Sequence, residues 1–406
     1  MTWKLNYSVF LSFALLYFFC NNTFLPLGLL YTALFTPLFL YWLYKEDRIV
    51  NMAKWSLLLV LPVPLHLILG FDIRTYIIST GLVITAWVFL FTAIEAIKKM
   101  NSKLEDVFEF VLFVNIILVL IVFIALQFNL GSYIFWHYTR ITHGVSIFPR
   151  LMLMSYEPSH YSLLLSPVFL FFILKILTGQ SKHTLLLIPV VALPIVLSLS
   201  FGVIGGLGIA IVLALLISFR KLPKISKNYL IFGFMFLFAI IFIFMLAWPS
   251  NTIFIRVVNI FTGNDTSGNG RMTYAFRIAN DMVNYYHAWM GVGPGQVKML
   301  FNDLIVNFYH NQLITEINYR IPNSMAEMLA TYGFYGFVLK IGLEVYFFIR
   351  MKIYQNLYSL TLFIFIFIYQ FTGSFTVNVA ELGTWALVFQ SRFTRFDFKQ
   401  LKTTSS

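Results

Sequence analysis

The stretch Val107–Phe128, VFEFVLFVNIILVLIVFIALQF, decides the fold class because Glu109 is its only charged residue. A helix needs about 20 consecutive apolar residues to cross roughly 30 Å of hydrocarbon. The run is continuous rather than alternating, so it predicts a membrane-spanning helix and not a strand of a membrane barrel.

Similar runs fill most of the chain, which has 406 residues, of which 60% are hydrophobic and only 11% are charged. A soluble domain would carry about 25% charged residues. We therefore predict an all-α polytopic membrane protein, with residues 1–406 forming a single transmembrane domain. About 12 spans of membrane-crossing length are expected, near residues 7–20, 24–44, 55–70, 76–97, 107–128, 158–178, 184–199, 203–219, 229–248, 325–348, 353–372 and 378–391.

Basic residues cluster in alternate connections between these runs, although the net charge of the chain is +12. Connections rich in Lys and Arg remain on the cytoplasmic side, so this clustering indicates orientation and not a nucleic-acid partner. It predicts that both termini are cytoplasmic. The first run, Tyr7–Cys20, lacks a signal-peptide cleavage site and is interpreted as a retained helix. Cys20 is the only cysteine, which excludes an intramolecular disulfide.

Two long segments fall on the outer face in this arrangement, residues 129–158 and a large loop of residues 249–322. Inside the large loop, Arg271–Met290 has the period of an amphipathic helix. Its apolar stripe is Tyr274, Ile278, Met282 and Tyr285, and its polar face is Arg277, Asn280, Asp281, Asn284 and His287. A second helical stretch is expected over Gln296–Tyr319. Both are expected to lie across the outer mouth of the bundle.

Arg271 is expected in the first turn of the amphipathic helix, just after Gly268 and Gly270. A helix N-terminus binds anions, and the arginine fork grips phosphate oxygens with two hydrogen bonds. The functional interpretation is a phosphate or pyrophosphate ligand, and the alternative is a solvated surface arginine. Arg277 has Asp281 four residues later, so a surface ion pair is at least as good an account as a substrate role.

Glu157 is the only acid of the first outer segment and stands where the chain re-enters the membrane. Partial desolvation would suit this carboxylate to act as a general base. The alternative is an ion pair with an arginine of the large loop. His160, three residues later, is the competing base. A histidine inside a helix that only forms a hydrogen bond with a neighbouring group is, however, the commoner case.

The outer segments lack the residue patterns typical of metal sites, since they contain no Asp-x-Asp pair, no His-x-x-x-His pair and no carboxylate cluster. We therefore expect no metal and no cofactor. Arginines would then have to offset the charge of a pyrophosphate leaving group, and the outer face supplies Arg140, Arg150, Arg256, Arg271, Arg277 and Arg320.

Three further features have structural interpretations. Gly291-x-Gly293-x-Gly295 lacks the strand of a nucleotide-binding motif and predicts a tight turn after the amphipathic helix. Lys340 and Glu344 stand four residues apart near the cytoplasmic end of a span and are expected to pair with each other. His66, inside a span, is a weak functional candidate.

Four short motifs occur in order over residues 130–345. They are Arg150 with Glu157-Pro158-Ser159, then Ser198-x-Ser200-x-Gly202, then Arg271 ahead of Gly291-Val292-Gly293-Pro294-Gly295, and last Pro322-Asn323-Ser324 before a span with Glu327 and Tyr332-Gly333-Phe334-Tyr335-Gly336. In their order and topology they resemble the bacterial O-antigen polymerases of the Wzy type, which share a superfamily with the O-antigen ligases.

This resemblance implies a GT-C-like glycosyltransferase of the bacterial inner membrane with a periplasmic active site. The donor would be a glycan on undecaprenyl pyrophosphate, and the acceptor a repeat unit on the same carrier. An acceptor hydroxyl would attack the anomeric carbon with inversion. Glu157 or His160 would activate it, and the substrate-binding set would be Arg140, Arg150, Arg271, Arg277, Tyr274 and Asn323. Membrane lipids and a chain-length regulator protein are the other partners considered.

Two other functions stay open at this point. Ligases of the superfamily usually carry a histidine just before the asparagine of the last motif, where this chain has Pro322, and this departure favours a polymerase. A lipid-linked oligosaccharide flippase has a similar size, but it would be expected to place charges inside its spans rather than in a long outer loop.

Overall fold

The computed structural model describes most of the helical bundle and part of the large loop. The described residues are 31–69, 72–100, 103–128, 132–140, 147–180, 184–222, 255, 258–259, 262, 266–300 and 321–403. The predicted spans near 7–20 and 229–248 lie outside them, as do Arg256, Arg320 and most of the helical stretch expected over Gln296–Tyr319, of which α16 (Gln296–Leu300) is described.

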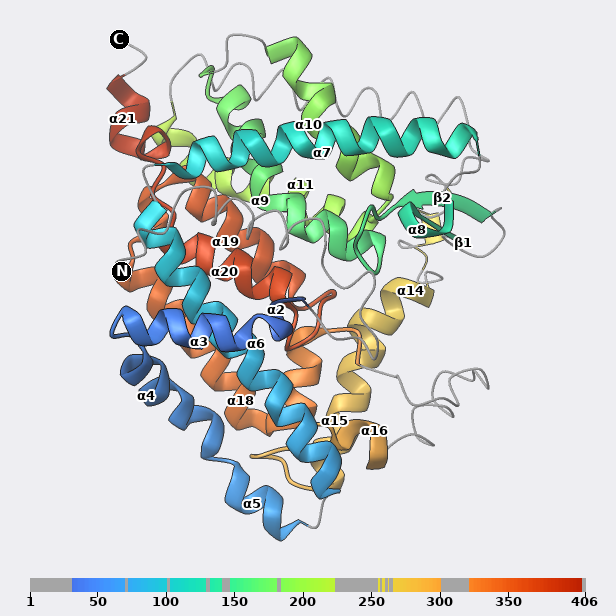
Figure 1. Ribbon diagram of the computed structural model, residues 1–406, viewed down its shortest axis with the longest axis vertical. Coiled ribbons are helices and arrows are strands. Elements are labelled where there is room, and N and C mark those ends of the chain that lie inside the picture. The colour runs from blue at the N-terminus through green and yellow to red at the C-terminus, as the bar shows by residue number, and fades with distance from the viewer. Residues whose placement is uncertain are drawn as a thin grey trace.

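Within the described residues the chain is helical apart from one two-stranded hairpin (Figure 1). In the part of the chain that the structure describes, six helices are long and apolar enough to cross a membrane. They are α4 with α5 (Ile49–Val60 and Val63–Ile68), α6 (Ile73–Met100), α7 (Leu104–Gln127), α9 (Pro158–Leu177), α11 with η3 (Phe201–Ser218 and Phe219–Lys221) and α18 (Ser324–Arg350). This architecture confirms the predicted class of all-α polytopic membrane protein.

Helix α9 forms the centre of the bundle, because nearly all of its side chains are buried. Around it pack α10 (Thr184–Ser198), α11, α19 (Leu357–Tyr369) and α20 (Val379–Gln390). The Phe171 ring lies edge-on to Phe108 and Tyr358, so α9, α7 and α19 share one aromatic core. Pro167 stands inside α9, and its carbonyl accepts a hydrogen bond from the Tyr358 hydroxyl.

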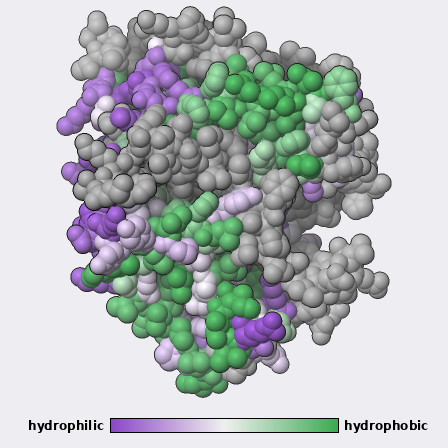
Figure 2. Space-filling model, viewed as in Figure 1, coloured by the Kyte–Doolittle hydropathy of each residue, from purple (hydrophilic) through white to green (hydrophobic). Residues whose placement is uncertain are grey.

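One end of the bundle carries a set of ion pairs and is called the basic end here. Glu95 at the end of α6 pairs with Arg48 and Lys98, and Glu105 at the start of α7 pairs with Lys175 and Arg395. Figure 2 shows hydrophilic residues gathered along the corresponding side of the molecule, near α21 (Phe398–Thr403). Connections that the charge pattern predicts on one face therefore meet in space.

The predicted span 325–348 is not one straight helix, because α18 bends at Gly333. This residue has φ 62° and ψ −159°, a conformation open essentially to glycine alone. The bend brings Lys340, in the second arm, to within 2.9 Å of the Ser324 hydroxyl at the start of the first. The expected pairing of Lys340 with Glu344 is wrong: Lys340 pairs with Glu381 of α20, since the bend points it at that helix.

The glycine-rich turn fills the space opened by this bend. The amides of Val292 and Gly293 donate to the carbonyls of Ala330 and Thr331, and those of Phe334 and Tyr335 donate to Ala288 and Trp289, at 2.9–3.0 Å. The turn therefore satisfies backbone groups that a broken helix would otherwise leave unpaired.

Two glycines make the contact between the turn and the bend. A Cβ atom on Gly291 would lie 2.6 Å from Ala330 O and Gly333 N, and one on Gly333 would lie 2.5 Å from the Trp289 backbone. Next to them, His66 of α5 is fully buried and binds Met290 O at 2.8 Å and the Tyr76 hydroxyl at 3.1 Å. The interpretation of this glycine motif as a tight turn is confirmed, and His66 ties the turn to α5 and α6.

Replacing Gly333 with alanine should destabilise the protein by at least about 2–3 kcal/mol, because the backbone conformation is strained for any Cβ and the added atom meets Trp289. Gly342→Ala is the matched control on the same helix: a Cβ there meets nothing within 4 Å. It should leave stability unchanged or raise it by up to about 1 kcal/mol. The thermal unfolding midpoints of the two purified variants decide this, and equal midpoints would contradict the role given to the bend.

The amphipathic helix begins earlier than predicted and contains a π-helical turn. It runs as α14 (Thr266–Asn269), the π-turn η4 (Gly270–Tyr274) and α15 (Ala275–Tyr285). Its buried face is rotated toward the positions that follow the predicted stripe, since Ala275, Ala279 and Val283 are buried whereas Tyr285 is 79% exposed. The buried side chains are Ala275, Ile278, Ala279, Met282 and Val283, which pack on the first arm of α18.

Candidate functional site

The first outer segment forms a β-hairpin beside the start of α9. Strands β1 (Trp136–Arg140) and β2 (Ile147–Leu151) are antiparallel, with His137 opposite Arg150. The Arg150 Nε donates to the carbonyl of Ser198 at 3.1 Å. Arg140 stands at the end of β1, and its side chain lies outside the described part. The hairpin thus anchors one of the predicted arginines against the turn between α10 and α11.

That turn, the Ser198-x-Ser200 motif, is also tied to α9. The Ser162 hydroxyl of α9 donates to Ser198 Oγ, which in turn accepts the amide of Ser200 and caps the turn. Leu199 between them has φ 47°, a left-handed conformation that costs energy for a non-glycine residue. The serines therefore hold a strained turn whose carbonyl positions Arg150.

Glu157 occupies the residue just before α9 and is half-buried. The Ser159 hydroxyl donates to Glu157 Oε1, which fixes the direction of the carboxylate. Burial lowers the pKa of His137, the nearby Arg150 charge lowers it further, and Glu157 acts in the opposite sense. His137 therefore has both Arg150 and Glu157 as electrostatic neighbours, and these three residues belong to one cluster.

His160 lies beneath this cluster rather than in it. Its side chain is 2% exposed, and its ring packs against Tyr156 with centroids 4.6 Å apart. The Tyr156 ring also lies near the ring of Phe375, in the segment after α19, with the two centroids 6.4 Å apart. Of the two predicted bases, Glu157 is the more accessible and His160 is enclosed by α9 and its neighbours.

Arg271 stands inside the π-turn η4 and not at a helix N-terminus, because α14 precedes it. The free amides expected there from the sequence are thus used within the helix. Single π-turns are found frequently at functional sites. The Arg271 side chain is half-buried, and it forms no ion pair with an acidic residue of the described part.

Asn323, predicted as a substrate ligand, is 0% exposed and has its amide group fully used. Its Oδ1 accepts the amide of Ala326 and so caps α18, while its Nδ2 donates to the carbonyls of Arg271 and Phe371. Asn323 therefore holds the backbone of η4, and with it Arg271, against the end of α19.

Tyr369, the last residue of α19, connects the two groups of residues. The charges of Arg271, Glu157 and Glu381 all act on its hydroxyl, in that order of size. Arg271 of the large loop and Glu157 of the first outer segment therefore share Tyr369 as an electrostatic neighbour, although the two are far apart in sequence. Tyr369 is not singled out by the sequence, because an aromatic residue at the end of a span resembles any interfacial aromatic.

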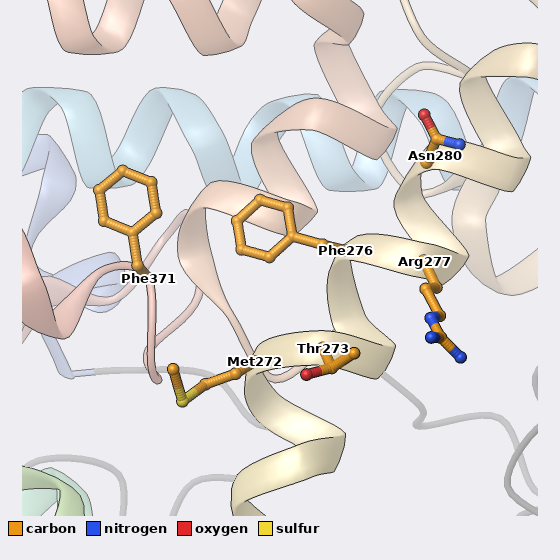
Figure 3. A pocket seen from close by; sticks show the side chains of 6 residues that line it. All are labelled: Met272, Thr273, Phe276, Arg277, Asn280 and Phe371. Carbon is orange, nitrogen blue, oxygen red and sulfur yellow. The ribbon is translucent and has the colours of Figure 1, made fainter.

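Arg277 lies on a neighbouring pocket of about 510 Å³ and is exposed. Figure 3 shows the Phe276 ring directed toward Phe371, with Arg277 extending away from both rings. The pocket is mainly apolar, and its lining residues are Met272, Thr273, Phe276, Arg277, Asn280 and Phe371. Within the described residues Arg277 forms no ion pair with Asp281, so the expected surface pair is not present. Tyr274, also predicted to bind substrate, is half-buried in the π-turn.

The candidate site thus consists of Glu157, Arg150 and Arg271, with the pocket at Arg277 next to the helix of Arg271. Within the described residues, no three His, Cys, Asp or Glu side chains gather closely enough to hold a metal ion. Such an arrangement can hold an anion on its guanidinium groups and accept a proton on Glu157.

Comparison with known families gives one match. Residues 184–341 match the family model described as O-antigen ligase, and the match contains the Ser198 turn, the helix of Arg271, the glycine turn and most of α18. It supports a place in the superfamily of O-antigen ligases and polymerases, whose members are glycosyltransferase-like membrane enzymes of surface-polysaccharide synthesis. None of the curated proteins compared matches the chain.

Proposed function

We propose that the protein polymerises oligosaccharide repeat units carried on undecaprenyl pyrophosphate, at the periplasmic face of the bacterial inner membrane. The observation that carries this proposal is the environment of Arg271, which is half-buried and whose backbone carbonyl is held by Asn323. Arg271 has no acidic ion-pair partner among the described residues, so its charge is available to an anionic ligand. The Glu157 carboxylate, which Ser159 orients, supplies the group that would receive a proton.

In the proposed reaction, the hydroxyl of the acceptor sugar attacks the anomeric carbon of the donor glycan. Glu157 accepts the hydroxyl proton, the new glycosidic bond forms with inversion, and the bond to the carrier breaks. The carrier leaves as undecaprenyl pyrophosphate, whose developing negative charge Arg271 and Arg150 stabilise. Arg277 binds the same lipid-linked substrate from the adjoining pocket. Asn323 acts through Arg271 rather than on the substrate.

A polymerase is favoured over a ligase by the start of α18. There Ile321-Pro322-Asn323 stands in place of the histidine–asparagine pair usual in ligases, and Asn323 is fully used in backbone bonds. A flippase is disfavoured because Arg150, Arg271 and Arg277 stand in the hairpin and in the helix of the large loop, and not inside the long apolar helices of the described part.

The test is the glycan size profile of a strain deleted for this gene, resolved on gels. Loss of polymerase activity should leave the lipid A-core capped with one repeat unit and no ladder. Bare core, with long chains accumulating on the lipid carrier, would instead assign the protein as a ligase. Bare core with only single lipid-linked units facing the cytoplasm would assign it as a flippase.

A further inference from the structure

Lys340 and Glu381 form an ion pair inside the helical bundle that the proposed reaction does not use. The Lys340 Nζ lies 2.6 Å from Glu381 Oε1, and the two side chains are 17% and 3% exposed. Ionisable groups inside a membrane bundle are costly and usually have a function. This pair joins the second arm of α18 to α20.

Ser324 links the ion pair to the first arm of α18. Its hydroxyl accepts from Lys340 Nζ at 2.9 Å and donates to Glu381 Oε1 at 3.2 Å. In a straight helix Ser324 and Lys340 would be roughly 24 Å apart along the axis. The contact therefore exists only because α18 bends, and it holds the two arms in the bent arrangement.

Asn323, the residue next to Ser324, carries the connection to the site. Its Nδ2 donates to Arg271 O at 2.8 Å and also to Phe371 O. The Ser324 amide donates to Gly373 O at 3.1 Å, so the same point of the chain is tied to the segment after α19 as well. A shift of Ser324 would therefore move the backbone that carries Arg271.

The hydrogen bonds of Gln370 connect the surroundings of the Lys340–Glu381 pair to the end of α19, where Tyr369 lies. Gln370, one residue after Tyr369, donates to Glu344 Oε2 at 2.8 Å, and its carbonyl accepts the Met325 amide. The charge of Glu381 also acts on the Tyr369 hydroxyl, as those of Arg271 and Glu157 do.

We infer that Lys340 and Glu381 are positioning residues, which hold Arg271 in place for the anionic group of the substrate by fixing Ser324 and Asn323. This inference rests on the proposed role of Arg271 as an anion ligand. The physical reason is that neither residue forms another ion pair in the described part, and a buried charge that loses its ion-pair partner is strongly disfavoured. The pair thus enforces one geometry of the bend.

The experiment is calorimetric titration of the full-length protein in lipid nanodiscs with inorganic pyrophosphate, which needs no knowledge of the sugars. Ser324→Ala removes the linking hydroxyl without leaving a buried charge, and Lys340→Met removes the ammonium group. Each should weaken pyrophosphate binding by about tenfold, the usual size of a loss of preorganisation of about 1.4 kcal/mol. Lys340→Arg, which keeps the charge, should retain most of the affinity.

The matched control is Ser391→Ala at the residue just after α20, where the buried hydroxyl donates, within the described residues, to Leu387 O of that helix alone. It should bind pyrophosphate as the wild type does. The thermal unfolding midpoint is measured for every variant, and each titration is carried out at a temperature well below that midpoint. Arg271→Ala, which removes the proposed anion ligand, should not bind pyrophosphate. If it does not, but Ser324→Ala and Lys340→Met bind pyrophosphate with unchanged affinity, the positioning role alone is overturned. Absence of binding to the wild type would overturn the anion site itself and the inference with it.

Discussion

Arg271→Ala is expected to abolish polymer, leaving single repeat units on the lipid A-core of a complemented deletion strain. Arg271 is half-buried, is held by Asn323 and has no acidic partner among the described residues. Removing one donor to a developing negative charge lowers turnover by about 10²–10³-fold. A slower enzyme of that kind cannot extend chains within a cell generation, so the gel should lose its ladder.

The chemistry of arginine makes this prediction more specific. Arg271→Lys keeps the charge but loses the planar fork that grips two phosphate oxygens, so short chains at reduced yield are expected. Arg350→Ala at the end of α18 is the matched control: Arg350 is exposed and bonds the Tyr346 hydroxyl. It should give a normal ladder. Full-length chains from Arg271→Ala, at wild-type protein levels, would end the assignment of Arg271.

Glu157→Gln is expected to lower turnover by about 10²–10⁴-fold, the range that a general base contributes. The amide keeps the size of the side chain and can still accept from Ser159, but it cannot take the proton of the acceptor hydroxyl. The Michaelis constant for the donor should change little, because in the proposed reaction the arginines and not Glu157 bind the pyrophosphate. The measurement is turnover of the purified enzyme on lipid-linked repeat units.

Two comparisons complete this prediction. Glu109→Gln changes a carboxylate that pairs with Lys175 at the basic end and should leave turnover unchanged. His160→Gln distinguishes the two candidate bases: it should lower the thermal midpoint, since His160 is buried, more than it lowers turnover. If His160→Gln removed activity while Glu157→Gln retained it, the two roles would have to be exchanged.

Hydropathy alone predicts the class of this fold, because the requirement to pair every backbone group in lipid leaves few alternatives to helices. The amphipathic helix is also predictable, within a few residues, from its period. Lys340 shows where local reasoning fails: Glu344 is its neighbour by spacing, but the bend at Gly333 gives it Glu381 instead. A glycine inside an apolar run does not reveal a bend, since glycines in spans more often permit close packing.

The candidate site, like the fold, is predictable from the sequence only in part. Arg150, Glu157 and Arg271 can be singled out from the sequence by charge and by their place in the outer segments. That Glu157 and Arg271 share Tyr369 as an electrostatic neighbour cannot be predicted, because it depends on how the chain folds around the end of α19. Nor does the sequence reveal that Asn323 is occupied by backbone carbonyls, which is a property of the packed helices.

The contact between the glycine turn and the bend of α18 also sets an order of events during biosynthesis. Until the turn arrives, the amides of Phe334 and Tyr335 have their best partners within a straight, continuous helix, because lipid offers none. Residues 324–350 should therefore enter the membrane unbent and bend only when the preceding loop, already translocated, docks on them. The part of the candidate site around Arg271 is then expected to be the last to mature, and a chain arrested before docking would be inserted but inactive.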